Sequence, residues 1–106
     1  MKTPHELITG FAKALNARDE SDLVSIFSHQ AVIRDGGLKF RGLGGVRNWI
    51  QTAIDRYDLR LKVLAITGHG QEWLFDAVVS GSFEGSPVRL EHSLTLEDGK
   101  IALLEI

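Results

Sequence analysis

The sequence of 106 residues contains no cysteine. Disulfides, thiolate nucleophiles and cysteine metal sites are therefore excluded, which suits a reducing compartment. The chain also lacks an apolar run approaching the ~20 residues that cross a membrane, and no such run follows the charged N-terminus as it does in a secretory signal. We therefore expect a cytoplasmic protein that does not associate with membranes.

A basic stripe is missing as well. The 12 Lys and Arg are interspersed with the 14 Asp and Glu, and the formal net charge is -2. The usual electrostatic footprint of a nucleic-acid binder is thus absent. The hydrophobic and charged fractions, 43% and 25%, are those of ordinary globular proteins. We predict a single domain over residues 1–106 with one core and no nucleic-acid partner.

Helices are predicted for the first half of the chain. Thr3, Pro4 and Glu6 have the spacing of a helix start with a capping box. After a polar break at 16–20, a second short helix is predicted to start at Ser21. A third helix follows the glycines before position 46, because the apolar residues there form one continuous face. That face consists of Val46, Trp49, Ile50, Ala53, Ile54 and Tyr57.

Strands are predicted elsewhere. Residues 31–35 and 38–40 form a small hairpin around Gly36 and Gly37. From Asp58 the apolar period becomes two. The strands expected from this period are 59–65, 72–84, 88–97 and 100–106. The inward face of the last strand stays open, because two apolar sets compete for the interior. These sets are Ile101 and Leu103 against Ala102, Leu104 and Ile106. Helices followed by a meander indicate an α+β fold with the helices on one face of the sheet.

The predicted sheet carries apolar residues on both faces. The set expected to face the helices includes Leu59, Leu61, Val63, Ala65, Trp73, Phe75, Ala77, Val79 and Phe83. The opposite parity also carries apolar residues, namely Leu64, Ile66, Leu74 and Val78. An apolar outer face suggests a partner surface, and a symmetric homodimer is the simplest partner.

Four segments of the chain carry a family resemblance. They are residues 11–19 (FAKALNARD), 27–35 (FSHQAVIRD), 45–49 (GVRNW) and 98–101 (DGKI). In order and spacing the chain resembles the SnoaL-like branch of the nuclear transport factor 2-like superfamily over essentially its whole length. The resemblance implies a cone-shaped, cystatin-like roll, in which three N-terminal helices lie on a strongly curved mixed or antiparallel sheet around a cavity. It also implies a fold shared by ketosteroid isomerases, polyketide cyclases, dehydratases and proteins that only bind, which commonly dimerise through their sheets.

Asp35 is the first candidate catalytic residue. It shares parity with Ala31 and Ile33, so its side chain is expected to face inward. The resemblance places it where ketosteroid isomerases have their general base, and partial desolvation would raise its basicity for proton transfer beside a carbonyl. The alternative is that Asp35 caps the turn at Gly36 and Gly37 by accepting backbone N–H bonds.

His92 is the second candidate. It stands in an apolar series with Leu90 and Leu94, so its ring is expected to point at the core or a cavity, where it needs a partner. With a one-residue gap, the resemblance aligns it near the acidic oxyanion donor of the isomerases, and it could donate to a ligand or exchange a proton. Without that gap Glu91 takes the position. The alternative is a core histidine satisfied by its neighbours.

Phe11 marks a departure from the isomerases, which have a tyrosine at this point of the first helix. The change removes a strong donor to a developing enolate, so it disfavours steroid isomerisation and favours binding or cyclase-like chemistry. Tyr57, at the end of the third helix, is not an obvious substitute. Phe11, Trp49, Trp73 and Leu90 are candidate ligand-binding residues, although aromatic residues at this spacing also serve as simple packing.

Other polar residues predict no further site. Arg34, Arg41, Arg47 and Arg89 are expected to face water. No histidine pair has metal-ligand spacing and no glycine group has a phosphate-loop context, so we expect neither metal nor cofactor. The leading hypothesis is a SnoaL-like pocket protein that binds a small apolar or carbonyl-bearing ligand, with acid–base chemistry by Asp35 and His92. The alternative is a non-catalytic homodimeric binding or interaction module.

Overall fold

The computed structural model describes residues 2–106 and shows three α-helices against a six-stranded sheet in this part of the chain. The helices are α1 (Pro4–Asn16), α2 (Glu20–Ile26) and α3 (Gly42–Gln51), and α3 continues as a π-helical turn, η1 (Thr52–Arg56). The strands are β1 (Phe27–Asp35), β2 (Leu38–Arg41), β3 (Arg60–His69), β4 (Glu72–Ser80), β5 (Val88–Glu97) and β6 (Lys100–Glu105).

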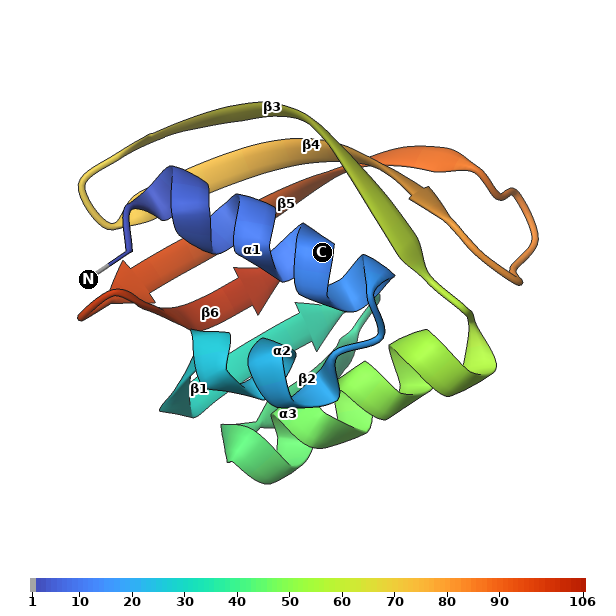
Figure 1. Ribbon diagram of the computed structural model, residues 1–106, viewed down its shortest axis with the longest axis horizontal. Coiled ribbons are helices and arrows are strands. Elements are labelled where there is room, and N and C mark those ends of the chain that lie inside the picture. Colours follow the sequence, from blue (N-terminus) through green and yellow to red (C-terminus); the bar gives the residue numbers. More distant parts are fainter. Residues whose placement is uncertain (1) are drawn as a thin grey trace.

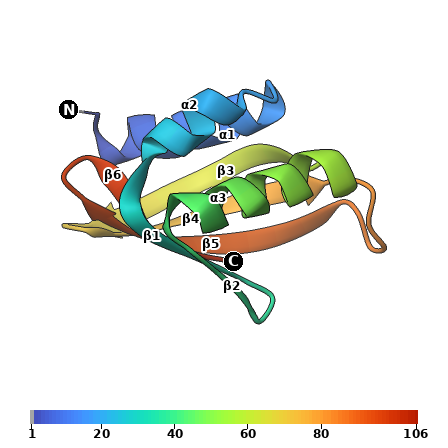
Figure 2. The ribbon, with the colours of Figure 1, turned by 90° about the horizontal axis from the view of Figure 1, so that it is seen from below.

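The sheet is mixed and strongly curved. Its strand order is β2-β1-β6-β5-β4-β3, and the neighbours are antiparallel except for the parallel pair β1–β6. The long strands β3, β4 and β5 bend over α1, while α3 runs along the other end of the sheet beside β1 (Figures 1 and 2). The predicted α+β cone with helices on one face is confirmed.

The predicted start of the first helix is confirmed by its cap, whereas α3 begins at Gly42, so the glycines predicted to precede it form its first turn. The side chains of Thr3 and Glu6 accept each other's backbone N–H at 3.1 and 2.9 Å, the reciprocal capping box. Helix α2 begins at Glu20, one residue earlier than predicted, because Asp19 accepts the N–H of Asp22 at 3.0 Å. The polar break thus contains the cap of the next helix.

Two bulges change the strand faces. In β3 the register shifts between Val63 and Ala65, so Ala65 is exposed and Ile66 pairs with Phe75 and packs against the core. The predicted inward Ala65 and outward Ile66 were wrong, because an extra residue inverts the alternation beyond it. In β6 both Ile101 and Leu104 are fully buried, and the register against β5 shifts between them. Neither predicted parity set alone faces the core.

The end of β4 was also predicted wrongly. The strand stops at Ser80, and Phe83 lies in the following loop rather than in the strand. The loop is tied to the end of the π-helical turn, because the N–H of Ser82 donates to the carbonyl oxygen of Tyr57 at 2.7 Å. The backbones approach closely here, which leaves no room for a side chain at Gly81.

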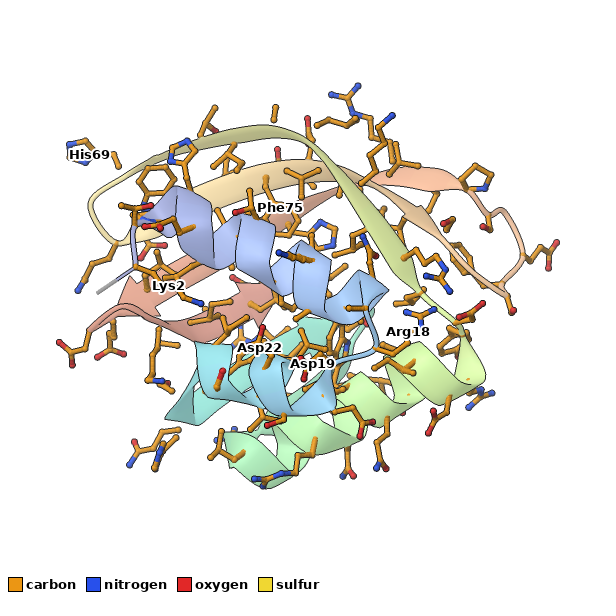
Figure 3. The ribbon with its side chains drawn as sticks, in the orientation of Figure 1. Lys2, Arg18, Asp19, Asp22, His69 and Phe75 are labelled. Carbon is orange, nitrogen blue, oxygen red and sulfur yellow. The ribbon has the colours of Figure 1, made fainter. Side chains whose placement is uncertain are left out.

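The C-terminal end of α1 is fastened to the start of β3. Asn16 accepts the backbone N–H of Leu61 and donates to its carbonyl oxygen, both at 2.8 Å. Arg18 donates to the carbonyl oxygen of Leu59 and pairs with Asp58. Figure 3 shows Arg18 at this junction, and Phe75 pointing from β4 towards α1. These polar contacts fix the C-terminal end of α1 against the start of β3.

Gly81→Ala should destabilise the protein by about 1–3 kcal/mol, because the new Cβ would clash with the carbonyl oxygen of Tyr57, a backbone atom that cannot move aside alone. Urea unfolding measures the change. Gly10→Ala is the control: its Cβ would meet no atom within 4 Å in the middle of α1, and it should stabilise by about 0.5–1 kcal/mol. Equal effects of both changes would contradict the close approach at Gly81.

Candidate functional site

A cavity of about 510 Å³ opens between α1, the π-helical turn, the β1–β2 hairpin and the sheet. This volume falls in the range of small-molecule sites. Its apolar lining is Phe11, Leu15, Leu38, Phe40, Trp49, Ala53, Leu59, Leu61, Val79, Phe83, Leu90 and Ile106. Its polar lining is Asp35, Thr52, Arg56, Tyr57 and His92. The cavity therefore combines mostly apolar walls with a few polar groups.

Asp35 ends β1 and is half-buried at this cavity. Its Oδ2 accepts the indole N–H of Trp49 at 2.9 Å. Trp49 is buried, and its ring stacks on Phe11 with 6.1 Å between centroids. Within the described residues, the hydrogen-bond partner of the carboxylate is this indole and not the backbone of the glycine turn that follows. One carboxylate oxygen is thus oriented by α3, and the other remains for a ligand.

His92 is 2% exposed, and its ring stacks on Phe75 at 4.4 Å between centroids and 9° between planes. Its Nδ1 lies 3.2 Å from the carbonyl oxygen of Leu90. A carbonyl oxygen only accepts, so Nδ1 must carry a proton, and in the neutral ring Nε2 then holds a lone pair. Within residues 2–106, every fully buried side-chain nitrogen or oxygen atom has a hydrogen-bond partner. Because His92 lines the cavity, Nε2 is an acceptor accessible from it.

Burial lowers the pKa of His92 below 6.5. The bond to the Leu90 carbonyl and the negative charges of Asp35 and Asp76 oppose this effect but are smaller. The imidazole is therefore neutral at neutral pH. Asp35 and His92, both singled out from the sequence, line the same cavity.

The four candidate wall residues do not all reach the cavity. Phe11, Trp49 and Leu90 line it, whereas Trp73 does not. The indole of Trp73 donates to the carbonyl oxygen of Gly70 at 2.9 Å and meets the ring of His5 edge-on at 5.4 Å. Its ring also packs over Gly68 in the neighbouring strand. Trp73 thus covers the start of α1, away from Asp35 and His92.

The π-helical turn supplies polar lining that sequence reasoning missed. The N–H of Tyr57 donates to the carbonyl oxygen of Thr52, five residues earlier, at 3.2 Å. Both side chains and that of Arg56 line the cavity. The signal for Tyr57 was its place in the apolar stripe of the third helix, but nothing in that periodicity indicated a π turn, a feature found often at functional sites.

Across residues 2–106, no group of three or more His, Cys, Asp or Glu side chains is arranged to hold a metal ion. None of the helices in this described part of the chain is both long and apolar enough to cross a membrane.

The pH dependence of stability tests the environment of His92. Folding lowers the pKa of His92, so below about pH 6.5 the unfolded chain binds a proton at His92 that the folded chain does not bind. Above the unfolded pKa, His92 is neutral in both states and does not change the free energy of unfolding. As the pH drops through 6.5 towards the folded pKa, the free energy of unfolding falls by up to about 1.4 kcal/mol per pH unit. In urea unfolding between pH 5 and 8, His92→Gln should flatten this slope, whereas exposed His69→Gln should keep it. A slope that survives in His92→Gln would contradict the assignment.

The comparisons with known proteins support a family assignment. The family profile described as SnoaL-like domain matches residues 8–104. A crystal structure from Sinorhizobium meliloti, provisionally named a polyketide cyclase, is 33% identical with a TM-score of 0.90, and the match covers 94% of this chain and 92% of that one. No curated protein gives a significant match.

More distant structures share the fold alone. An uncharacterised cystatin-fold protein from Novosphingobium aromaticivorans is 20% identical with a TM-score of 0.83, covering 99% of this chain and 97% of its own. A hypothetical protein from Catenulispora acidiphila with a ketosteroid isomerase-like fold, solved with trimethylamine, is 18% identical with a TM-score of 0.81, covering 98% and 85%. Because the SnoaL-like profile matches nearly the whole chain and the Sinorhizobium meliloti structure is 33% identical to it, this chain belongs to the SnoaL-like family.

Proposed function

We propose that the cavity binds a small, largely apolar carbonyl compound and that Asp35 and His92 exchange protons with it. The observation that carries the proposal is that a carboxylate and a neutral imidazole with an accessible lone pair line one mostly apolar cavity. Paired acid–base groups in such a cavity are the usual mark of a proton-transfer site. The provisional name of the Sinorhizobium meliloti relative, a polyketide cyclase, supports carbonyl chemistry of this kind.

Asp35 is suited to take the first proton. The indole N–H of Trp49 holds one of its oxygens at 2.9 Å and stabilises the charged form. The other oxygen accepts a proton from the carbon beside the ligand carbonyl, and the electron pair of that C–H bond moves to form the enolate. Return of the proton to a different atom of the enolate gives an isomer, and attack of the enolate on a second carbonyl of the ligand would close a ring.

The negative oxygen of the enolate needs a hydrogen-bond donor. Phe11 cannot provide one, and neutral His92 presents an acceptor at Nε2. The hydroxyl groups of Thr52 and Tyr57 are the neutral donors that line the cavity. His92 would take the abstracted proton from Asp35 at Nε2 and donate it onward to the enolate. Asp35 is then a carboxylate again, and its negative charge favours the protonated imidazole.

Asp35→Asn tests this function. Incubation with 2-tetralone in D₂O should exchange the hydrogens beside the carbonyl, and the variant should lower the enzyme-dependent exchange rate at least about 100-fold, because an amide cannot take the proton. Proton NMR follows the loss of signal. The melting temperature should stay near wild type, since the amide oxygen can still accept the Trp49 bond. Asp22→Asn, which changes an exposed carboxylate of α2 that does not line the cavity, is the control and should keep the rate. Unchanged exchange in Asp35→Asn would sink the proposal.

We also propose that the outer face of the sheet forms a homodimer. Leu64 and Leu74 are 44% and 39% exposed there, on the adjacent strands β3 and β4. Two exposed leucines on the outer face of the sheet favour burial against a like surface. If the cavity catalyses no reaction, this interface would serve a non-catalytic homodimeric binding module.

Light scattering after size-exclusion chromatography tests the dimer. Wild type at tens of micromolar should have twice the monomer mass, and Leu74→Lys should shift it to the monomer, because a charge in the interface would be desolvated without a partner. Leu38→Lys, which changes a 65% exposed leucine on β2, is the matched control and should leave the dimer intact. A monomeric wild type would exclude this interface.

A further inference from the structure

The charges around the cavity are unevenly placed. Its charged lining residues are Asp35, on the sheet side, and Arg56, which ends the π-helical turn. The ion pairs of the described residues involve Arg18, Arg34, Arg60 and Arg89. Arg56 belongs to none of them, and it does not pair with Asp35. Within residues 2–106, the cavity thus has a guanidinium without a carboxylate partner.

Arg56 contacts an aromatic ring. Its Cζ lies 5.3 Å from the ring centroid of Tyr57, the geometry of a cation–π contact. Such a contact uses the face of the guanidinium and leaves its N–H donors, which point outward in its plane, available. Arg56 is exposed and Tyr57 is half-buried, so this pair forms part of the rim of the cavity.

The other polar end of the cavity repels anions. Asp35 is a carboxylate, and the accessible nitrogen of neutral His92 is a hydrogen-bond acceptor. An anionic group placed there would face one negative charge and one lone pair. The same anion at Arg56 would gain charge-assisted hydrogen bonds, which are stronger than neutral ones. A ligand with one anionic group is therefore oriented, with that group at Arg56 and its neutral end at Asp35.

We propose that Arg56 determines ligand specificity by binding an anionic group, so that the ligand class is an apolar carbonyl acid rather than a neutral ketone. The carbonyl part of this assignment rests on the proposed function. The acidic part rests on the unpaired guanidinium alone. The apolar lining of the same cavity, which includes Leu59 and Phe83, suits an aryl or alkyl body that carries the acid at one end.

The matched control lies on the same helical segment. Arg47 is also exposed and outside the ion pairs, but it borders the groove between α2 and α3 and does not line this cavity. Arg47→Gln therefore removes the same charge as Arg56→Gln without touching the proposed site. Neither side chain is buried, so both variants should fold.

The experiment compares 3-benzoylpropionate with its primary amide, two aryl ketones that differ in one charge. Titration followed by Trp fluorescence and by NMR should show that wild type binds the acid about three- to tenfold more tightly than the amide, with the preference falling at high salt. Arg56→Gln should abolish the preference by weakening the acid only, Arg56→Lys should retain part of it, and Arg47→Gln should keep it whole.

The failures of the two proposals differ. If wild type binds acid and amide equally, and both exchange the hydrogens beside the ketone through Asp35, the role of Arg56 is overturned and the proposed function stands. If Arg47→Gln lowers the preference as much as Arg56→Gln, the effect is one of net charge and the site assignment is wrong. If wild type binds neither the acid nor the amide, both proposals are contradicted.

Discussion

The aromatic packing around Phe11 is the constraint on which the cavity depends. Phe11 is fully buried on α1, where its ring stacks on Trp49 and meets Phe75 edge-on. Trp49 in turn orients Asp35, and Phe75 stacks on His92. A single side chain of the first helix therefore contacts the supports of both polar groups. The curved sheet matters because it brings both β1, through Phe27, and β4, through Phe75, into contact with this one ring.

In this arrangement Phe11 has a packing role, in addition to lacking the hydroxyl group of the isomerase tyrosine. The resemblance to ketosteroid isomerases identified the residue as a lost donor, and the structure shows it as the link between Trp49 and Phe75. The tautomer of His92 moves the site further from an oxyanion hole, because its accessible nitrogen accepts. The donors that remain come from the π-helical turn, at Thr52, Arg56 and Tyr57. The cavity thus has acceptors on the sheet and donors on the helix.

Local chemistry explains what the sequence could predict. The capping box at Thr3 depends on side chains three residues apart, and the hairpin depends on Gly36 and Gly37, both of which have positive φ. The inward face of β5, and with it His92, follows from regular alternation in an uninterrupted strand. For the same reason Asp35, two residues after Ile33 on β1, could be placed at the cavity.

The missed features depend on contacts between distant segments. The bulge near Leu64 arises from the pairing of β3 with β4, and no residue type within β3 predicts it. Trp73 and Phe83 share one parity, yet the chain leaves the strand before Phe83, which reaches the cavity while Trp73 packs on Gly68. Arg56 acquires its place from a π turn whose end is fixed by Ser82. Spacing along the chain carries none of this information.

The central claim is that a neutral His92 presents Nε2 to a cavity that it shares with Asp35. The most direct measurement is ¹⁵N NMR of the histidine side chains at neutral pH, free and with a bound aryl ketone. The structure predicts that His92 is the Nδ1–H tautomer, and that its Nε2 signal shifts on ligand binding and in Asp35→Asn. A His92 that is protonated on Nε2, or whose Nε2 responds to neither change, would contradict this account.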